Sequence, residues 1–195
     1  MKIAFFDTHG FERQPFLDAN AKHGYSITFF EPRLTAETAT LARGFPAVCA
    51  FVNDKVDRAT QAILKDGGTR LIALRSAGFN HVDLTAAEAM GLAVVRVPEY
   101  SPYSVAEHAV CLLLALNRKI HRAYARVREL NFSLDGLVGF DLHGKTVGII
   151  GTGKIGAVMA RILGGFGCRL LLYDRAPRKD LERELDATYV DLSTL

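Results

Sequence analysis

A glycine-rich segment in the second half of the chain constrains the fold more than any other feature. The segment Gly151-Thr-Gly-Lys-Ile-Gly156 fits G-x-G-x-x-G, and it lies between a strand pattern over Thr146–Ile150 and a helical pattern over Ile155–Gly164. In this pattern the first glycine permits a tight turn, the second lets the backbone approach a pyrophosphate, and the third lets the helix pack closely on the strand. The N-terminus of the helix then offers free N–H groups to the phosphates. The segment therefore predicts a strand–loop–helix unit that binds a dinucleotide.

An acidic residue follows this loop at a suitable distance. Asp174 stands 23 residues after Gly151 and follows a second strand pattern, Leu170–Tyr173. A carboxylate at this place accepts hydrogen bonds from ribose hydroxyls and repels a 2′-phosphate, which favours NAD over NADP, although the adjacent Arg175 weakens that preference. The residues expected to bind the dinucleotide are Gly151, Gly153, Lys154, Ile155, Gly156 and Asp174.

Two alternatives to dinucleotide binding remain open on this motif alone. Enzymes that use S-adenosylmethionine carry a related order of strand, glycine loop and acidic residue. A glycine-rich turn can also be purely structural, with Asp174 simply ending its strand.

The first hundred residues alternate between strand and helix patterns. Helical patterns cover Arg58–Asp66 and Thr85–Met90. Strand patterns cover Ile3–Phe6, Ser26–Phe30, Ala47–Val52, Leu71–Leu74 and Ala93–Val97. Such strands are apolar along their whole length when helices cover both faces of a parallel sheet. Residues 1–100 are therefore predicted to form a five-stranded, doubly wound α/β domain.

A long helix is predicted next. Ser104 and Glu107 have the spacing of a capping box, and Pro102 suits a helix entrance. The pattern continues to about Glu129, with an apolar first half that indicates burial between domains or subunits. We therefore divide the chain into a domain over 1–100, a helix and linker over 101–143, and an incomplete second domain over 144–195. The second domain also has a helical pattern at 181–185 and a strand pattern at 189–190.

The composition excludes several classes of protein. A net charge of +3 is too small to indicate a nucleic-acid-binding protein. The longest apolar stretch, Ala109–Leu116, is far shorter than the ~20 residues of a membrane-spanning helix. The three cysteines, Cys49, Cys111 and Cys168, lie singly in apolar runs and are expected to be buried thiols in a reducing compartment. With no signal-peptide pattern at the N-terminus, we expect a cytoplasmic protein.

Seven segments together resemble the D-isomer-specific 2-hydroxyacid dehydrogenase family, and among its members the fermentative D-lactate dehydrogenases. The resemblance covers essentially the whole chain, without a large gap. The segments are Ala47–Asp54, Leu71–Asn80, Val95–Pro102, Val105–Ala109, Asn117–Arg122, Asn131–Ser133 and Gly144–Gly156. The resemblance implies a flavodoxin-like substrate domain followed by the first part of a Rossmann NAD-binding domain, with the long helix between them and a homodimer formed through that helix.

The resemblance also implies a substrate loop, Arg75–Asn80, whose backbone N–H groups hold the carboxylate of a small 2-keto acid. Ala77 and Gly78 are the matching positions, and an anion bound by backbone donors requires small residues there. Tyr100 matches a tyrosine that borders the substrate pocket. Without the resemblance, the loop would be interpreted as a simple turn and Tyr100 as a packed loop residue.

The family uses an Arg, a Glu and a His for its chemistry, and the resemblance places all three after Leu195. None of the histidines present is assigned to catalysis; they are His9, His23, His81, His108, His121 and His143. We therefore assign no catalytic residue and expect no metal. We interpret the chain as a fragment, because a complete nucleotide domain has six strands and only the first of these are present. We expect the chain to be inactive alone, because it lacks the Arg, the Glu and the His.

Reduction of pyruvate to D-lactate with NADH is the function expected for the complete protein. Two alternatives remain open. One is a family member that acts on a different 2-keto acid, and the other is a non-catalytic NAD-binding module that serves as a sensor or interaction protein.

Overall fold

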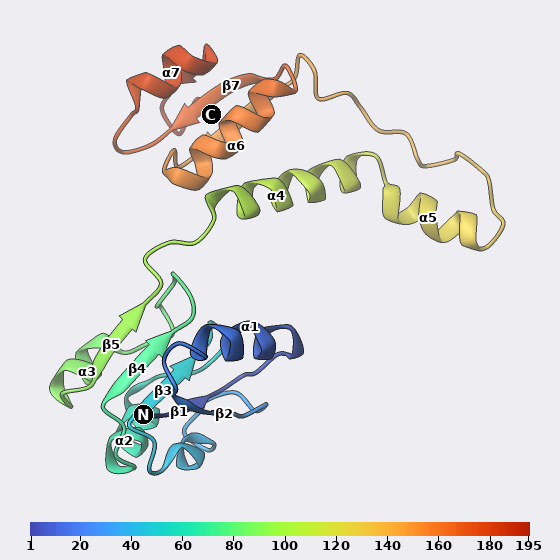
Figure 1. The fold of residues 1–195 in the computed structure, drawn as a ribbon. Coiled ribbons are helices and arrows are strands. Elements are labelled where there is room, and N and C mark those ends of the chain that lie inside the picture. Colours follow the sequence, from blue (N-terminus) through green and yellow to red (C-terminus); the bar gives the residue numbers. More distant parts are fainter. The chain divides into compact units, whose positions relative to one another are not determined.

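The computed structural model describes all residues from 1 to 195, and the chain divides into two compact units, Met1–Tyr100 and Ser101–Leu195. Both units are α/β with entirely parallel sheets, which confirms the predicted fold class (Figure 1). No helix in the structure combines the length and apolar character needed to cross a bilayer.

The first unit is built on one five-stranded parallel sheet (Figure 1). Its strands are β1 (Lys2–Phe5), β2 (Ser26–Phe29), β3 (Ala47–Ala50), β4 (Leu71–Leu74) and β5 (Ala93–Arg96), in the order β2-β1-β3-β4-β5. The helices are α1 (Gly10–Asn20), α2 (Arg58–Asp66) and α3 (Leu84–Ala89), with a short 3₁₀ helix at Ala39–Ala42. The direction in which successive strands are added to the sheet reverses between β1 and β3. In open parallel sheets of this kind, ligands bind at the carboxyl ends of the strands beside such a switch point.

The core of the first unit explains why the strand patterns were visible in the sequence. All four residues of β3 are buried, whereas every residue of the edge strands β2 and β5 is half-buried or exposed. Large side chains that are fully buried come from several elements, including Phe6, Leu64 and Ile72. A central parallel strand is covered on both faces and therefore has a continuous apolar sequence.

A buried ion pair joins the loops at the carboxyl ends of the first-unit strands. The Arg75 side chain is 6% exposed and the Glu12 side chain 9%, and Arg75 Nε donates to Glu12 Oε1 at 2.8 Å. Arg75 Nη2 also donates to the carbonyl oxygen of Asp7 at 2.6 Å. The guanidinium carbon lies 4.3 Å from the ring centroid of Phe5 and 4.5 Å from that of Phe51. One arginine therefore connects residues that follow β1, β3 and β4.

The second unit contains two helices followed by a three-stranded sheet (Figure 1). The helices α4 (Pro102–Asn117) and α5 (Ile120–Arg128) precede β6 (Thr146–Ile150), α6 (Lys154–Gly165), β7 (Arg169–Tyr173), α7 (Lys179–Leu185) and β8 (Thr188–Tyr189). The strand order is β6-β7-β8, and every pairing is parallel. The helix α4 packs against α6, and Leu113 contributes to the same core as Leu163 and Leu172.

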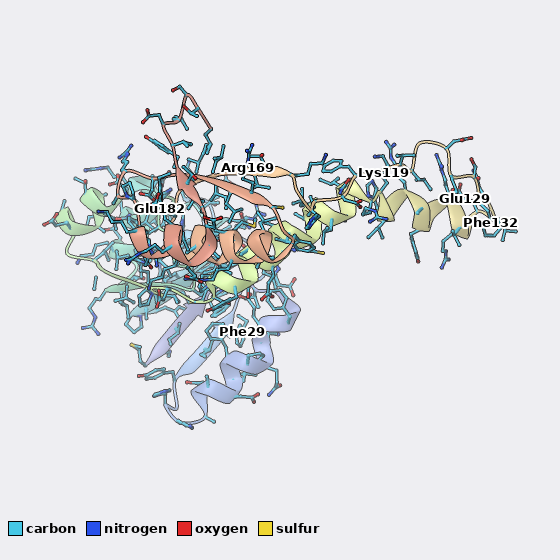
Figure 2. All side chains as sticks on the ribbon, turned by 90° about the horizontal axis from the view of Figure 1, so that it is seen from above. Phe29, Lys119, Glu129, Phe132, Arg169 and Glu182 are labelled. Carbon is cyan, nitrogen blue, oxygen red and sulfur yellow. The ribbon has the colours of Figure 1, made fainter.

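The prediction of a single helix from Ser104 to about Glu129 is wrong in two respects. The helix begins at Pro102, and the Ser101 side chain, not that of Ser104, caps it by accepting a hydrogen bond from Ser104 N at 3.2 Å. Proline suits the first helical position because its missing N–H would have no partner there. The helix is then interrupted at Lys119, whose φ of 50° lies in the left-handed region (Figure 2).

Two further features differ from the sequence interpretation. The patterns identified above do not include α1, in which Phe11 and Leu17 are exposed, so no clear apolar face marks it. Cys111 is exposed, although Cys49 is buried as expected. Leu112 is 50% exposed and Leu116 65% exposed within the single chain, so the burial of the long helix between domains or subunits stays a prediction.

Candidate functional site

The three glycines of the glycine-rich loop differ in what the structure requires at their positions. Gly151 has a φ of +90°, a conformation that other residues rarely adopt. A Cβ on Gly156 would lie 1.9 Å from the carbonyl oxygen of Gly151, so a side chain there is excluded by the packing of α6 on β6. A Cβ on Gly153 would meet no atom within 4 Å, and its φ is −62°. Nothing within the chain requires glycine at position 153, so its small size is available for the close approach of a ligand.

Asp174, at the end of β7, is fixed by hydrogen bonds to the same loop. Its Oδ2 accepts from Thr152 N at 2.6 Å and from Thr152 Oγ1 at 3.1 Å, and its Oδ1 accepts from Ala176 N at 3.0 Å. The N–H of Ala176 and that of Thr152 lower the pKa of Asp174. The carboxylate is therefore ionised at neutral pH, and Oδ1, which accepts one hydrogen bond, retains room for a further donor.

Tyr189 extends this network to the third strand. Its hydroxyl donates to Thr152 Oγ1 at 2.6 Å, and Thr152 is 1% exposed. Neither Thr152 nor Tyr189 was predicted to be part of the site. Thr152 occupies a variable position of the glycine motif, and Tyr189 lies 37 residues further along the chain, so only the parallel order β6-β7-β8 brings them together.

A pocket of about 410 Å³ lies beside Asp174 at the carboxyl ends of β7 and β8. Its lining residues are Tyr173, Asp174, Pro177, Tyr189, Val190, Asp191 and Thr194. Two of the other expected cofactor residues, Lys154 and Ile155, begin α6, where the positive end of the helix dipole lies. All six expected residues thus lie in one loop, one helix start and one adjacent strand end of the second unit.

The expected substrate loop of the first unit has its carbonyl groups occupied and its N–H groups free. The carbonyl oxygen of Ser76 accepts from Val97 N at 3.2 Å, that of Ala77 from Arg96 Nη1 at 3.1 Å, and that of Gly78 from Ser76 Oγ at 2.8 Å. The backbone N–H groups of Ala77, Gly78 and Phe79 have no hydrogen-bond acceptor within the protein. Consecutive free N–H groups form a concave site for an anion.

The candidate substrate residues lie in two segments: Ala77 and Gly78 on this loop, and Tyr100 after β5. Gly78 is exposed, and an added Cβ would meet no atom within 4 Å. Tyr100 lies in the segment that follows β5 and is 69% exposed. Arg96 connects this segment to the loop, because its Nη1 also lies 3.1 Å from the carbonyl oxygen of Pro98.

The histidines and acidic residues supply no arranged metal centre, since no group of three or more potential ligands lies close enough together to hold an ion. His81 lies near the substrate loop, and burial lowers its pKa while its Nε2 is buried without a partner. His9 Nε2 is 3.8 Å from Asp7 Oδ1 at the end of β1.

These features define an α/β protein with two parallel-sheet units, of which the second has the glycine loop and strand-end carboxylate typical of dinucleotide-binding domains. The model of the D-isomer specific 2-hydroxyacid dehydrogenase catalytic domain matches residues 3–189, and the chain belongs to this family. Members of the family are oxidoreductases that act on the CH–OH group of their substrates.

Curated relatives and solved structures support this assignment over the whole chain. The 2-hydroxyacid dehydrogenase homolog 1 of Schizosaccharomyces pombe is 55% identical, over 94% of this chain and 55% of its own length. The D-lactate dehydrogenase of Escherichia coli is 52% identical, over 100% of this chain and 59% of its own length. The apo-structure of the E. coli enzyme matches with a TM-score of 0.92, over all of this chain and 61% of that one. The chain thus spans somewhat more than half the length of these relatives.

A solved structure that contains ligands is also similar. The D-lactate dehydrogenase from Aquifex aeolicus, complexed with NAD and lactic acid, is 32% identical and matches 98% of this chain and 56% of that one, with a TM-score of 0.80.

Proposed function

We propose that this chain supplies the substrate-binding unit and part of the NAD-binding unit of a D-lactate dehydrogenase, which reduces pyruvate to D-lactate with NADH. The observation that carries the proposal is the 52% identity to the E. coli D-lactate dehydrogenase over all 195 residues. The free N–H groups of the loop Ala77–Phe79 and the glycine loop give the two ligands separate binding groups. This chain's residues have binding roles in the proposal, and none is assigned to proton transfer.

The glycine loop and Asp174 fit NAD. The start of α6 and the open space at Gly153 suit the pyrophosphate, and the carboxylate of Asp174 suits the adenosine ribose. The pocket beside Asp174, with the rings of Tyr173 and Tyr189 in its wall, offers a surface for the adenine. When bound, the cofactor supplies the hydride that the substrate carbon receives.

Replacing Asp174 with alanine is expected to relax the preference for NADH. The variant loses a charge-assisted hydrogen bond to the ribose, so kcat/KM for NADH should fall about tenfold or more, while the value for NADPH falls less or rises. The measurement is kcat/KM with each cofactor at saturating pyruvate, in the full-length gene product. Asp180→Ala is the control, because Asp180 is an exposed residue of α7 whose carboxylate pairs with Arg178. Equal use of the two cofactors by the unmutated protein would contradict the assignment of Asp174.

The loop Ala77–Phe79 fits the carboxylate of pyruvate. Hydrogen bonds from backbone N–H groups to an anion are charge-assisted, and the small residues Ala77 and Gly78 let the anion come close. Tyr100 is proposed to border the same substrate, offering both an apolar ring and a hydroxyl.

Replacing Gly78 with valine is expected to raise KM for pyruvate about tenfold or more, because the branched side chain occupies the space beside the free N–H groups. The fold should be unaffected, since an added Cβ meets no atom within 4 Å. KM for pyruvate and for NADH would be measured in the full-length gene product, with NADH expected to remain within about twofold. Gly165→Val, at the exposed end of α6, is the matched control, because its Cβ also meets no atom. Unchanged pyruvate kinetics in a folded Gly78→Val protein would remove this loop from the substrate site.

A second candidate function within the family is the reduction of a larger 2-keto acid. The structure of D-2-hydroxyisocaproate dehydrogenase matches this chain with a TM-score of 0.80 at 27% identity. The ratio of kcat/KM for pyruvate to that for a branched 2-keto acid decides between the two, with a ratio well above one expected.

We also propose that the protein is a cytoplasmic homodimer formed through α4 and α5. Large apolar side chains are exposed along these helices and the segment that follows, and a contiguous exposed apolar surface marks an interaction site. They include Leu112, Leu116, Ile120, Tyr124, Val127, Leu130 and Phe132. Neither a nucleic acid nor a membrane is proposed as a partner.

A further inference from the structure

Arg96, the last residue of β5, holds the carbonyl side of the loop whose N–H groups are free. Its Nη1 lies 3.1 Å from the carbonyl oxygen of Ala77, 3.3 Å from that of Val97 and 3.1 Å from that of Pro98. Its guanidinium carbon is 5.3 Å from the ring centroid of Phe79, within the range of a cation–π contact. One side chain therefore contacts Ala77 and Phe79, on either side of Gly78, and also the segment that follows β5.

The direction of a free N–H group follows from the carbonyl group in the same peptide. The peptide bond is planar, and there is no cis peptide in the chain, so the C=O of Ala77 and the N–H of Gly78 point in opposite directions. When Arg96 attracts the carbonyl oxygen of Ala77, the N–H of Gly78 must point away from Arg96. The hydrogen bond thereby determines the direction in which Gly78 can donate.

The neighbouring peptides are held in a related way by other groups. Val97 N holds the carbonyl oxygen of Ser76, and Ser76 Oγ holds that of Gly78. The N–H groups of Ala77 and Phe79 are therefore also fixed by the opposite ends of their peptides. Of the three restraints, only the one on the central peptide comes from a charged side chain, which in addition places a positive charge near the free donors.

We propose that Arg96 is a positioning residue for the substrate carboxylate: by holding the carbonyl oxygen of Ala77, it fixes the Gly78 N–H in the direction in which that group donates to the anion. This inference rests on the proposed role of the loop Ala77–Phe79 in binding a 2-keto acid. Without Arg96, the Ala77–Gly78 peptide is free to rotate. Fixing this peptide again when the carboxylate binds then reduces the net binding free energy of the carboxylate.

A purely structural role for Arg96 would predict that loss of its side chain lowers the melting temperature. The residue is exposed, and its hydrogen bonds to the three carbonyls lie at the surface. Exposed interactions of this kind contribute little to stability, because water replaces them readily. Loss of the side chain should therefore change the melting temperature little, whereas it should change the affinity for the anion clearly.

The test compares Arg96→Ala and Arg96→Lys with the unmutated full-length gene product. For Arg96→Ala we expect KM for pyruvate to rise about tenfold, the size expected for weakening one hydrogen bond to a charged group. KM for NADH should stay within about twofold and the melting temperature within about 3 °C, given the small contribution of surface interactions. Arg96→Lys retains a donor and the charge and should recover part of the affinity.

A second measurement observes the loop directly. In ¹⁵N-labelled protein, the amide resonance of Gly78 should shift when oxamate, a small carboxylate analogue of pyruvate, is added in the presence of NADH. In Arg96→Ala the same shift should require about tenfold more oxamate, in line with the expected change in KM.

The outcomes separate this inference from the function on which it rests. An unchanged KM for pyruvate in Arg96→Ala, together with a raised KM in Gly78→Val, would overturn the role of Arg96 and leave the loop as the substrate site. Unchanged values in both variants would overturn the role of the loop itself. A melting temperature that falls strongly, with KM for NADH rising as much as KM for pyruvate, would assign Arg96 a structural role and overturn the proposal.

Discussion

Replacing Gly156 with alanine is expected to lower the free energy of unfolding of the second unit by about 3 kcal/mol, at the upper end of the usual range for overpacking. The added Cβ would lie 1.9 Å from the carbonyl oxygen of Gly151 and 2.9 Å from its carbonyl carbon. Both are backbone atoms in the turn between β6 and α6, so no side-chain rotation can relieve the contact. The helix would have to move away from β6, and contacts between α6 and the core around Leu163 would be lost.

The matched control is Gly153→Ala, which adds the same methyl group only three residues away in the sequence. A Cβ at Gly153 meets no atom within 4 Å, and the backbone there has a φ of −62°, which alanine adopts readily. This variant should unfold at the same urea concentration as the unmutated full-length protein, followed by circular dichroism, but should bind NADH more weakly. Equal stability of the Gly156→Ala and Gly153→Ala variants would contradict the packing role of Gly156.

Replacing Glu12 with glutamine is expected to destabilise the first unit by about 3–5 kcal/mol, the usual cost of breaking a buried ion pair from one side. The guanidinium of Arg75 would keep its charge in a site where its side chain is only 6% exposed. Its Nη2 would keep the carbonyl oxygen of Asp7 as an acceptor and its Nη1 is already buried without a partner, so neither atom replaces the lost negative charge. The unfolding midpoint in urea measures the effect. Glu31→Gln, at an exposed position, is the control and should change the midpoint little.

The pH dependence of stability provides an independent check of this pair. Burial of Glu12 opposes its ionisation, but the hydrogen bonds from Arg75 and from His9 N, together with the Arg75 charge, hold its pKa below the ordinary 4.5. A lowered pKa in the folded state gives stability that is fully present above about pH 4.5 and is lost as the pH falls through the folded value. The Glu12→Gln variant should lack this part of the acid-side loss. An identical acid-side loss in both proteins would show that Glu12 is not the responsible group.

Local features of the sequence were sufficient to predict much of the fold. The strands Leu71–Leu74 and Thr146–Ile150 and the helix Arg58–Asp66 have the predicted bounds, because their apolar periodicity is set by burial on parallel sheets. The helix α1 was not found, since its apolar residues are at least partly exposed and its single buried residue is the charged Glu12. The interruption at Lys119 was also missed, because a left-handed backbone at lysine has no sequence signature comparable to glycine.

The sequence by itself determined the family, the parallel α/β class and the glycine loop with its acidic partner, because these depend on short segments with fixed spacing. Only the tertiary structure decided which side chains fix the candidate sites. Tyr189 reaches Thr152, Arg75 reaches Glu12, and Arg96 reaches the carbonyl oxygen of Ala77 through contacts between residues 19 to 63 positions apart. Parallel strands bring their carboxyl ends to one edge of the sheet, and this places side chains from distant segments within hydrogen-bonding distance, which no local pattern encodes.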